Sequence, residues 1–447
     1  MSGPELITLG CRLNFAESEA MRASVGEADD LVIVNSCAVT AEAVRQARQA
    51  IRRVARERPE ARIVVTGCAA QTEPETFAKM PEVDRVVGNA EKIAPSSFAK
   101  SSPFVPSEVE GREGGEALGA RTSTALGTNG VLGSGFAEKV RVSDIMAVRE
   151  IAPHLAAGFS ERARAFVEVQ NGCDHRCTFC IIPYGRGNSR SVPAGAVIDR
   201  IQRQLDHGAR EVVLTGVDLT SYGPDLPGAP SLGRLVERIL RHVPALERLR
   251  LSSLDSVEID DRLFDLITGD DRIMPHLHLS LQAGDDMILK RMKRRHSRAQ
   301  SIAIVERLKA ARPEIAIGAD IIAGFPTESD AMATNTLALI DDCDIVFGHI
   351  FPYSPRAGTP AAKMPPVPQP TIKARAKALR EASAQRRADW LATLVGTTQS
   401  VLVERADGRG HAGNFAEAQV EGSAEIGAIV AMRVTGIDGD QLTGVLA

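Results

Sequence analysis

The feature that most constrains this chain is a run of three cysteines within eight residues: Cys173, Cys177 and Cys180. A loop this short directs its thiolates toward one point, as three corners of a cubane [4Fe–4S] cluster require. Such a cluster normally takes four cysteine ligands, so a set of three leaves one iron open to another ligand. We interpret this central set as a cluster site that does chemistry rather than one that only carries electrons.

A zinc site or a disulfide scaffold would fit the central set less well. Zinc usually takes a fourth Cys or His, often in paired C-x-x-C motifs, and the run offers only His175 besides its cysteines. A disulfide scaffold is typically short, secreted and rich in cysteine, whereas this chain has seven cysteines in 447 residues. An iron–sulfur cluster is therefore the favoured interpretation.

A second group of cysteines follows strands near the N-terminus. Residues 5–92 alternate short aliphatic runs with helical stretches, which predicts parallel strands joined by helices. Three of the runs end at Cys11, Cys37 and Cys68, which we call the N-terminal set. Ligands bind such sheets at the carboxyl ends of the strands, so these cysteines should share one edge. Their placement predicts a second metal cluster.

The rest of the chain divides into three further parts. A stretch rich in Ser, Gly, Pro and Glu between about Pro95 and Gly135 predicts a flexible insertion or linker, bounded here at residues 95–158. Strand and helix alternate again in residues 159–396, which predicts a complete or partial (β/α) barrel with its active site at the carboxyl ends of the strands. Short strands with Gly turns predict a small β-barrel at residues 397–447.

The expected fold class is therefore α/β, with a doubly wound parallel sheet in residues 1–94, a partial (β/α) barrel and a small C-terminal β-barrel. The net charge of −4 means that any nucleic acid must bind to local basic patches. Two candidates are a helix face and the basic run at residues 290–296; the face carries Arg45, Arg48, Arg52 and Arg56. No apolar stretch approaches 18 residues and the start lacks a signal-peptide pattern, which predicts no membrane span and a cytoplasmic protein.

With both cysteine sets placed, the chain resembles the methylthiotransferase family of radical S-adenosylmethionine (SAM) enzymes. The resemblance covers nearly the whole chain outside the insertion, and the C-terminal unit is similar to the family's TRAM domain, a small RNA-binding barrel. It is carried by the central loop and by these segments: Thr8-Leu9-Gly10-Cys11, Asn35-Ser36-Cys37-Ala38-Val39-Thr40, Thr66-Gly67-Cys68, Ile181-Ile182-Pro183-Tyr184-Gly185-Arg186-Gly187, Leu214-Thr215-Gly216-Val217, His278-Leu279-Ser280-Leu281-Gln282, Asp320-Ile321-Ile322-Ala323-Gly324-Phe325-Pro326 and Phe351-Pro352-Tyr353-Ser354-Pro355-Arg356.

The resemblance implies two [4Fe–4S] clusters and SAM as cofactors. The cluster on the central set would give one electron to bound SAM, and the resulting radical would remove hydrogen from carbon 2 of an adenine. The cluster on the N-terminal set would hold the methylated sulfur for transfer. The resemblance also implies tRNA as the partner that carries the substrate, and a reducing partner similar to flavodoxin or ferredoxin.

Within the family, the motifs around Cys11 and Cys37 are most similar to the branch that acts on N6-threonylcarbamoyladenosine beside the tRNA anticodon. The branch for N6-isopentenyladenosine usually has Gln-Met-Asn after its first cysteine, where this chain has Arg12-Leu13-Asn14. The branch that modifies an aspartate of a ribosomal protein tends to have Pro there. Both branches stay open as alternatives, and so does an iron–sulfur electron-transfer protein, although such carriers usually close their clusters with four cysteines.

Four other residues are weaker candidates. Gly216 and Gly324 would let the backbone approach SAM, or would be ordinary turn glycines. Asp320 ends a predicted strand and would bond SAM or substrate, with a capping role as the alternative. Cys343 lies away from both cysteine sets, and we expect a buried thiol.

Overall fold

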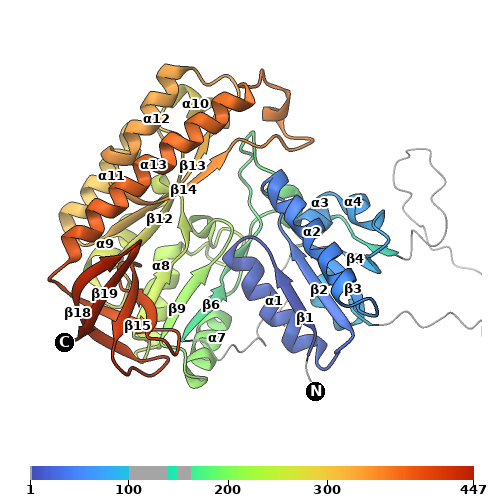
Figure 1. The fold of residues 1–447 in the computed structure, drawn as a ribbon, viewed down its shortest axis with the longest axis horizontal. Helices are drawn as coiled ribbons and strands as arrows, with labels where there is room; N and C mark the ends of the chain where they lie inside the picture. Colours follow the sequence, from blue (N-terminus) through green and yellow to red (C-terminus); the bar gives the residue numbers. More distant parts are fainter. Residues whose placement is uncertain (1–2, 100–138, 150, 152–162) are drawn as a thin grey trace, which may run out of the picture.

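The computed structural model describes residues 3–99, 139–149, 151 and 163–447 (Figure 1). Most of the insertion predicted at residues 95–158 therefore lies outside the described residues. Among its described parts, β5 (Val140–Arg141) joins the N-terminal sheet beside β4. No described helix is long and apolar enough to span a membrane.

The N-terminal part is a five-stranded parallel sheet in the order β1-β2-β3-β4-β5, with helices on both of its faces. Met21 of α1 packs with Leu31 and Ile33 on one face, and α2 packs with Val32 and Val34 on the other. A parallel sheet covered on both faces was the sequence prediction, and it is confirmed. The elements are β1 (Glu5–Thr8), α1 (Arg12–Val25), β2 (Leu31–Ser36), α2 (Ala41–Glu57), β3 (Arg62–Gly67), α3 (Cys68–Thr72), α4 (Pro74–Ala78), β4 (Arg85–Val87) and the 3-10 turns η1 (Glu91–Ile93) and η2 (Pro95–Ser97).

The central part is a partial barrel of parallel strands surrounded by helices, as predicted. Two sheets, β10-β9-β6 and β11-β12-β13-β14, are joined by a bridge between Leu249 and Ile273. The strands are β6 (Arg164–Glu168), β9 (Glu211–Thr215), β10 (Arg248–Leu251), β11 (Ser253–Leu254), β12 (His276–Gln282), β13 (Ala316–Ala323) and β14 (Ile345–Pro352). The helices are α7 (Ala194–Asp206), α8 (Leu232–His242), α9 (Asp261–Gly269), α10 (Asp286–Met292), α11 (Arg298–Ala311) and α12 (Asp330–Asp342).

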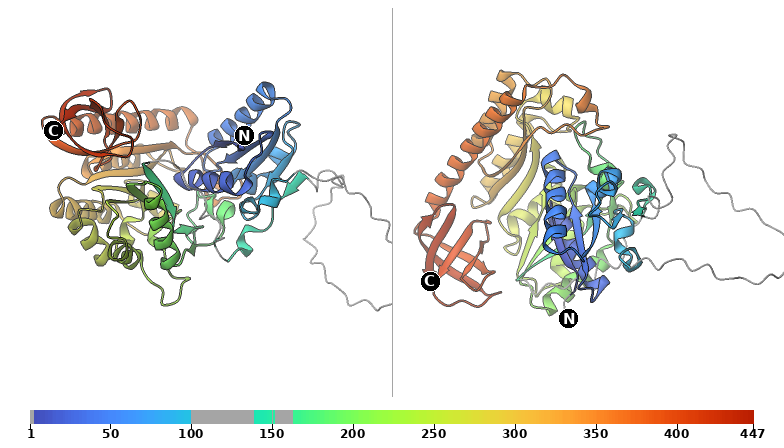
Figure 2. Two further views of the ribbon diagram at one scale, coloured as in Figure 1. Left: turned by 90° about the horizontal axis from the view of Figure 1, so that it is seen from below. Right: turned by 45° about the vertical axis from the view of Figure 1, so that its right-hand side comes forward.

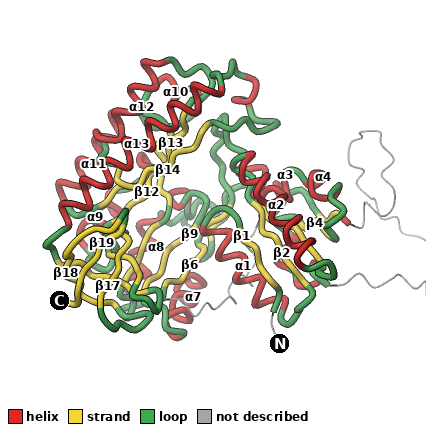
Figure 3. The backbone as a smooth tube through the Cα atoms, viewed as in Figure 1, coloured by secondary structure: helices red, strands yellow, loops and turns green. Residues whose placement is uncertain are grey.

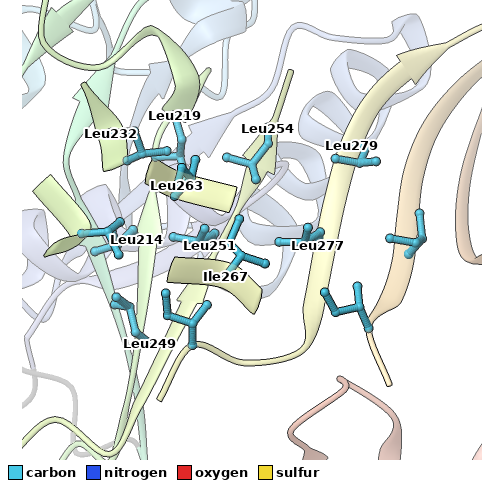
Figure 4. Packing of buried hydrophobic residues seen from close by; sticks show 14 of the residues in the cluster. Leu214, Leu219, Leu232, Leu249, Leu251, Leu254, Leu263, Ile267, Leu277 and Leu279 are labelled. Carbon is cyan, nitrogen blue, oxygen red and sulfur yellow. The ribbon is translucent and has the colours of Figure 1, made fainter. Parts of the chain in front are cut away.

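Strand alternation separates an apolar exterior from a polar interior in this barrel. Leu249, Leu251 and Leu277 point outward and pack against helix residues such as Ile267 (Figure 4). Their neighbours on the same strands, such as Arg250, therefore point inward. This alternation explains why a barrel with a conventional leucine-rich core also has charged groups inside.

The C-terminal part begins with the 3-10 turn η7 (Pro360–Lys363) and the long helix α13 (Gln369–Leu394), which packs along β14 and α12 (Figures 1 and 3). A closed barrel follows in the order β15-β16-β17-β19-β18, as predicted. Its strands are β15 (Thr398–Val403), β16 (Arg409–Ala412), β17 (Glu417–Glu421), β18 (Ile429–Asp438) and β19 (Gln441–Leu446).

The N-terminal part lies against the central barrel with α1 beside β6 (Figures 1 and 2). The C-terminal barrel follows the C-terminal end of α13. It contacts the central barrel at the end where the central strands begin. Two separate parts of the chain thus border the central barrel: the N-terminal part beside β6, and the C-terminal barrel at the first residues of the strands.

Candidate metal centre

The central set lies in a loop between β7 (Gln170–Asn171) and α6 (Ile182–Arg186), above the carboxyl end of β6. Thr178 anchors this loop because its N–H donates to Met292 O at 3.1 Å and its hydroxyl donates to Arg291 O at 2.8 Å. Phe179 packs edge-on against Phe325, with 6.3 Å between the ring centroids. The loop is therefore held on the barrel by contacts that do not use its sulfurs.

The sulfurs of the central set have the surroundings that cluster ligands need. The backbone N–H groups of His175 and Ile182 donate to Cys173 and Cys180, and hydrogen bonds to sulfur are one way a protein tunes such clusters. Burial raises the pKa of the Cys180 thiol to about 12, and burial followed by the Asp218 charge raises the pKa of Cys173. These thiols lose their protons when a metal replaces them, so the donor set fits a cluster.

Behind the central set lies an ion pair that sequence reasoning missed. Arg294 donates to Asp255 Oδ2 at 2.8 Å, and its other nitrogen lies 3.7 Å from Cys177 Sγ. Burial alone would raise the pKa of Asp255, but its bond with His296 and the charge of Arg294 lower it to about 2. A fixed positive charge therefore faces Cys177.

This pair reduces the basic patch predicted at residues 290–296 without removing it. Arg294 and His296 point inward to Asp255, and Arg295 pairs with Glu258 at 2.7 Å. The run thus presents Lys290, Lys293 and Arg295 to solvent, with Arg295 paired to Glu258, while Arg294 and His296 are turned toward Asp255. Charge density along the sequence could not reveal this, because the acidic partners lie about 40 residues earlier.

The N-terminal set gathers at the carboxyl edge of its sheet, as expected. Gly10 has a φ of 102°, and a Cβ there would lie 3.0 Å from Cys37 Sγ, so the glycine lets the turn before Cys11 pass close to Cys37. Burial and the nearby Cys68 raise the pKa of the Cys37 thiol to about 12, with the Val39 N–H donating to its sulfur. The Cys11 thiol donates to Asn14 Oδ1 at 3.8 Å, and the Asn89 amide donates to Cys68 Sγ at 3.7 Å. This donor set also fits a cluster.

Arg186 connects the two cysteine sets. It follows the central loop, yet its guanidinium donates to both carboxylate oxygens of Glu17 at 2.9 and 3.1 Å and to Asn14 Oδ1 at 2.5 Å. Burial would lower the pKa of Arg186, but the charges of Cys68 and Glu17 raise it well above its ordinary value. The Arg186 guanidinium is therefore placed between the central loop and the N-terminal set.

Further contacts join the same two parts of the chain. Asn89 donates to Gly185 O at 2.5 Å, and its amide nitrogen also faces Cys68. Lys92 is buried against Glu17, with 2.6 Å between nitrogen and oxygen. Burial would raise the pKa of Glu17, but Arg186 and Lys92 lower it to about 2, so this carboxylate stays charged.

The structure also places the four weaker candidates. Gly216 follows β9, where a Cβ would lie 3.0 Å from Gln170 Oε1. Asp320 lies inside the barrel and contacts His278 Nε2 at 3.0 Å and His349 Nδ1 at 3.4 Å. Gly324 has a φ of 72° and lies where a Cβ would be 2.6 Å from Ile372 of α13, so packing accounts for this glycine. The prediction for Cys343 is confirmed, since its thiol is fully buried in the core.

A charged layer closes the interior at the first residues of the strands. Glu211 contacts Arg250 at 2.7 Å, Arg164 at 3.3 Å and Arg248 at 3.7 Å. Phe415, from the loop between β16 and β17, lies with its ring centroid 4.9 Å from the Arg250 guanidinium carbon. The C-terminal barrel thus seals this end of the interior with an aromatic ring over a buried ion network.

Two family models and several curated proteins are similar to this chain. The radical SAM superfamily model matches residues 167–340, and the uncharacterized protein family UPF0004 matches residues 5–88. The chain is 44% identical to the threonylcarbamoyladenosine tRNA methylthiotransferase MtaB of Rickettsia prowazekii over 97% of this chain and 95% of that protein. It is 33% identical to the MtaB of Aquifex aeolicus over 95% of this chain and 98% of that protein.

Two further similarities lie outside the proteins named MtaB. A tRNA-2-methylthio-N(6)-dimethylallyladenosine synthase of Cereibacter sphaeroides is 34% identical over 89% of this chain and 86% of that protein. Among solved structures, the radical SAM methyltransferase TsrM of Kitasatospora setae is similar with a TM-score of 0.46 and 16% identity, over 77% of this chain and 66% of that one.

Proposed function

Because this chain belongs to the radical SAM methylthiotransferase family and aligns with MtaB relatives over nearly its whole length, we propose that it methylthiolates N6-threonylcarbamoyladenosine in tRNA. The hydrogen on carbon 2 of the adenine is replaced by a methylthio group. The observation that carries this proposal is the 44% identity to an MtaB protein over 97% of the chain. The two cysteine sets, held on facing parts of one molecule, support it.

Radical SAM membership implies one [4Fe–4S] cluster and SAM. We assign that cluster to Cys173, Cys177 and Cys180, and we propose a second cluster on Cys11, Cys37 and Cys68. When bound, these cofactors supply one-electron chemistry that can activate a carbon bearing no acidic proton. Gly216 and Gly324 stay our candidates for contact between the backbone and SAM, and we propose that Asp320 bonds SAM or substrate from the polar interior.

The protein's own residues hold and orient these groups. Arg186 and Asn89 fix the central loop against the N-terminal set, so the two reacting centres keep one relative position. Arg294 presents a positive charge to the central set, and the N–H groups of His175 and Ile182 point at its sulfurs. Orientation of this kind is what a protein contributes to cofactor chemistry.

The partners follow from the substrate. The protein binds tRNA through the anticodon region, and a flavodoxin- or ferredoxin-like protein supplies electrons. A protein with these partners works in the cytoplasm.

Iron analysis tests the two-cluster assignment. Anaerobic reconstitution should yield about eight irons per chain, four for each set. Replacing the three central cysteines by Ala should leave about half of that iron, and so should replacing the N-terminal three. Cys343→Ala is the matched control and should keep all of it. Unchanged iron in either triple variant would contradict the assignment.

Product analysis tests the separate roles of the two sets. A Cys37→Ala variant should still form 5′-deoxyadenosine from SAM, because the central set is intact, but should give no methylthiolated tRNA. Loss of 5′-deoxyadenosine in a well-folded variant would argue against separate roles.

Supplying tRNAs that carry threonylcarbamoyladenosine or isopentenyladenosine in parallel tests the substrate. Product from the first only is expected. If only the isopentenyladenosine tRNA were methylthiolated, the proposed substrate would be wrong, although the proposed reaction class would still hold.

A further inference from the structure

Arg12 is a cation that points into the barrel interior from the N-terminal part. It directly follows Cys11 at the start of α1. Its guanidinium carbon lies 5.3 Å from the centroid of the Phe415 ring, and the charged groups that act on it are Arg164, Arg250, Glu211 and Asp320. A side chain next to a proposed cluster ligand therefore reaches the polar interior of the central barrel.

The other arginines of this interior are neutralised by carboxylates, and Arg12 is not. Arg250 and Arg248 contact Glu211, and Arg164 contacts both Glu211 and Glu404, the latter at 2.8 Å. Among the described residues, no carboxylate oxygen lies within 4.0 Å of Arg12. Four guanidinium groups thus face three carboxylates: Glu211, Glu404 and Asp320.

A partly buried guanidinium without a counter-charge is costly, and an anion that enters the site relieves the cost. Asp320 acts on Arg12 only from beyond ion-pair distance, because its carboxylate is bonded to His278 and His349 instead. The His349 side chain is 58% exposed, so this part of the interior is open to solvent. An anionic group of a substrate can therefore reach Arg12.

N6-threonylcarbamoyladenosine carries such an anion, the α-carboxylate of its threonyl group, whereas an isopentenyl group is uncharged. Arginine binds carboxylates through two parallel N–H···O bonds, which adds directional specificity to charge. We propose that Arg12 binds this carboxylate and thereby selects the threonylcarbamoyl group; this inference rests on the function proposed above. A phosphate of the anticodon loop offers similar chemistry, and the experiment must separate the two sources.

The test uses anticodon stem-loop RNAs that carry threonylcarbamoyladenosine, its threoninamide analogue without the carboxylate, or unmodified adenosine. The reconstituted enzyme is compared with Arg12→Gln, Arg12→Lys and the control Arg22→Gln, an exposed arginine of the same helix. Dissociation constants are measured anaerobically for each RNA, and kcat/KM is measured for methylthiolation. Iron content shows whether each variant still holds both clusters.

Arg12→Gln should weaken binding of the carboxylate RNA by roughly 30-fold or more, the loss typical of one partner of a close charge pair. It should hardly change binding of the threoninamide RNA, and Arg12→Lys should recover part of the loss. Arg22→Gln should resemble the unmodified enzyme with every RNA.

Two results would overturn the proposal. If Arg12→Gln lowered the affinity for the carboxylate RNA and the amide RNA equally, Arg12 would bind a backbone phosphate instead. If all variants bound each RNA with the same affinity, Arg12 would not contact the RNA at all. If the proposed function were wrong, the result would differ from both of these, because the enzyme without substitutions would not methylthiolate the threonylcarbamoyl RNA.

Discussion

At the scale of single residues, Arg186 joins the parts of the chain that carry the two cysteine sets. Its guanidinium bonds Glu17 and Asn14 of the N-terminal part and Asn171 of the central part, the last at 3.1 Å. Such buried groups tolerate loss of a partner poorly, because the remaining charge has no solvent to stabilise it. The geometry of the two proposed clusters thus depends on one side chain that ligates neither.

Replacing Arg186 by Met tests this dependence. The variant leaves Glu17 with only Lys92 as a cationic partner, so the free energy of unfolding should fall by about 3–5 kcal/mol. Urea unfolding of the cluster-free protein measures the decrease. Arg22→Met, on the exposed side of α1, should change it by less than about 0.5 kcal/mol. Similar decreases in both variants would contradict the role given to Arg186.

At the scale of secondary-structure elements, three neighbouring strands are tied together at their first residues. Glu211 begins β9, and the arginines that contact it lie on β6 and β10. Burial alone would raise the pKa of Glu211, but Arg250, followed by Arg164 and Arg248, lowers it to about 2. An unfolded glutamate has a pKa of about 4.3, so folding stabilises the charged form.

This difference predicts how stability depends on pH. Because the folded pKa lies below the unfolded one, the contribution is complete above about pH 5 and is lost as pH falls toward 2. It amounts to about 3 kcal/mol. Urea unfolding of the cluster-free protein between pH 7 and pH 3 should show the decline, and Glu211→Gln should show a shallower one. Equal slopes in the two proteins would exclude Glu211 as a source.

Elements were more predictable from the sequence than the contacts between them. Alternating strand and helix patterns, with cysteines after the strands, predicted both sheets and the edges at which the cysteines lie, because these signals are local. Arg186 and Glu17 are 169 residues apart, and Arg250 and Gly413 are 163 apart, so no local pattern predicts that they bond. For the same reason the sequence could not show that Arg294 and His296, in the run at 290–296, turn toward Asp255.

At the scale of the whole molecule, charge is unevenly distributed. The C-terminal barrel, predicted to bind RNA, has seven Asp and Glu residues against three Arg in residues 397–447. Helix α2 instead exposes Arg45, Arg52 and Arg56 on one face of the N-terminal part, where Arg45 pairs with Glu42 and Arg52 lies 3.9 Å from Glu82. Phosphates are bound by such local cationic surfaces, so α2 is the stronger candidate for the salt-dependent part of tRNA binding.

Charge reversal on α2 tests this candidate. Changing Arg45, Arg52 and Arg56 to Glu should weaken tRNA binding and reduce its salt dependence, by about one unit of slope for each phosphate that the protein no longer neutralises. Helix α8 offers a matched control, because Arg234, Arg238 and Arg241 are equally exposed there. Filter binding across a range of salt concentrations measures both slopes. A decrease no greater than that of the α8 variant would exclude α2.

The ring of Phe415 has a consequence for how the enzyme is made. A ribosome releases this residue after the cysteines of both sets and after every strand of the central barrel. Until then Arg250 lacks the Gly413 carbonyl that it bonds at 3.0 Å, and Arg248 lacks Ser400 at 2.7 Å. In the nascent chain, the central barrel is therefore not covered at the end where its strands begin, and water can reach its interior there. A chain that is truncated before Phe415 has the six cysteines of the two sets but lacks the residues that cover this end of the barrel. Completion of translation is therefore itself a step in building the enzyme.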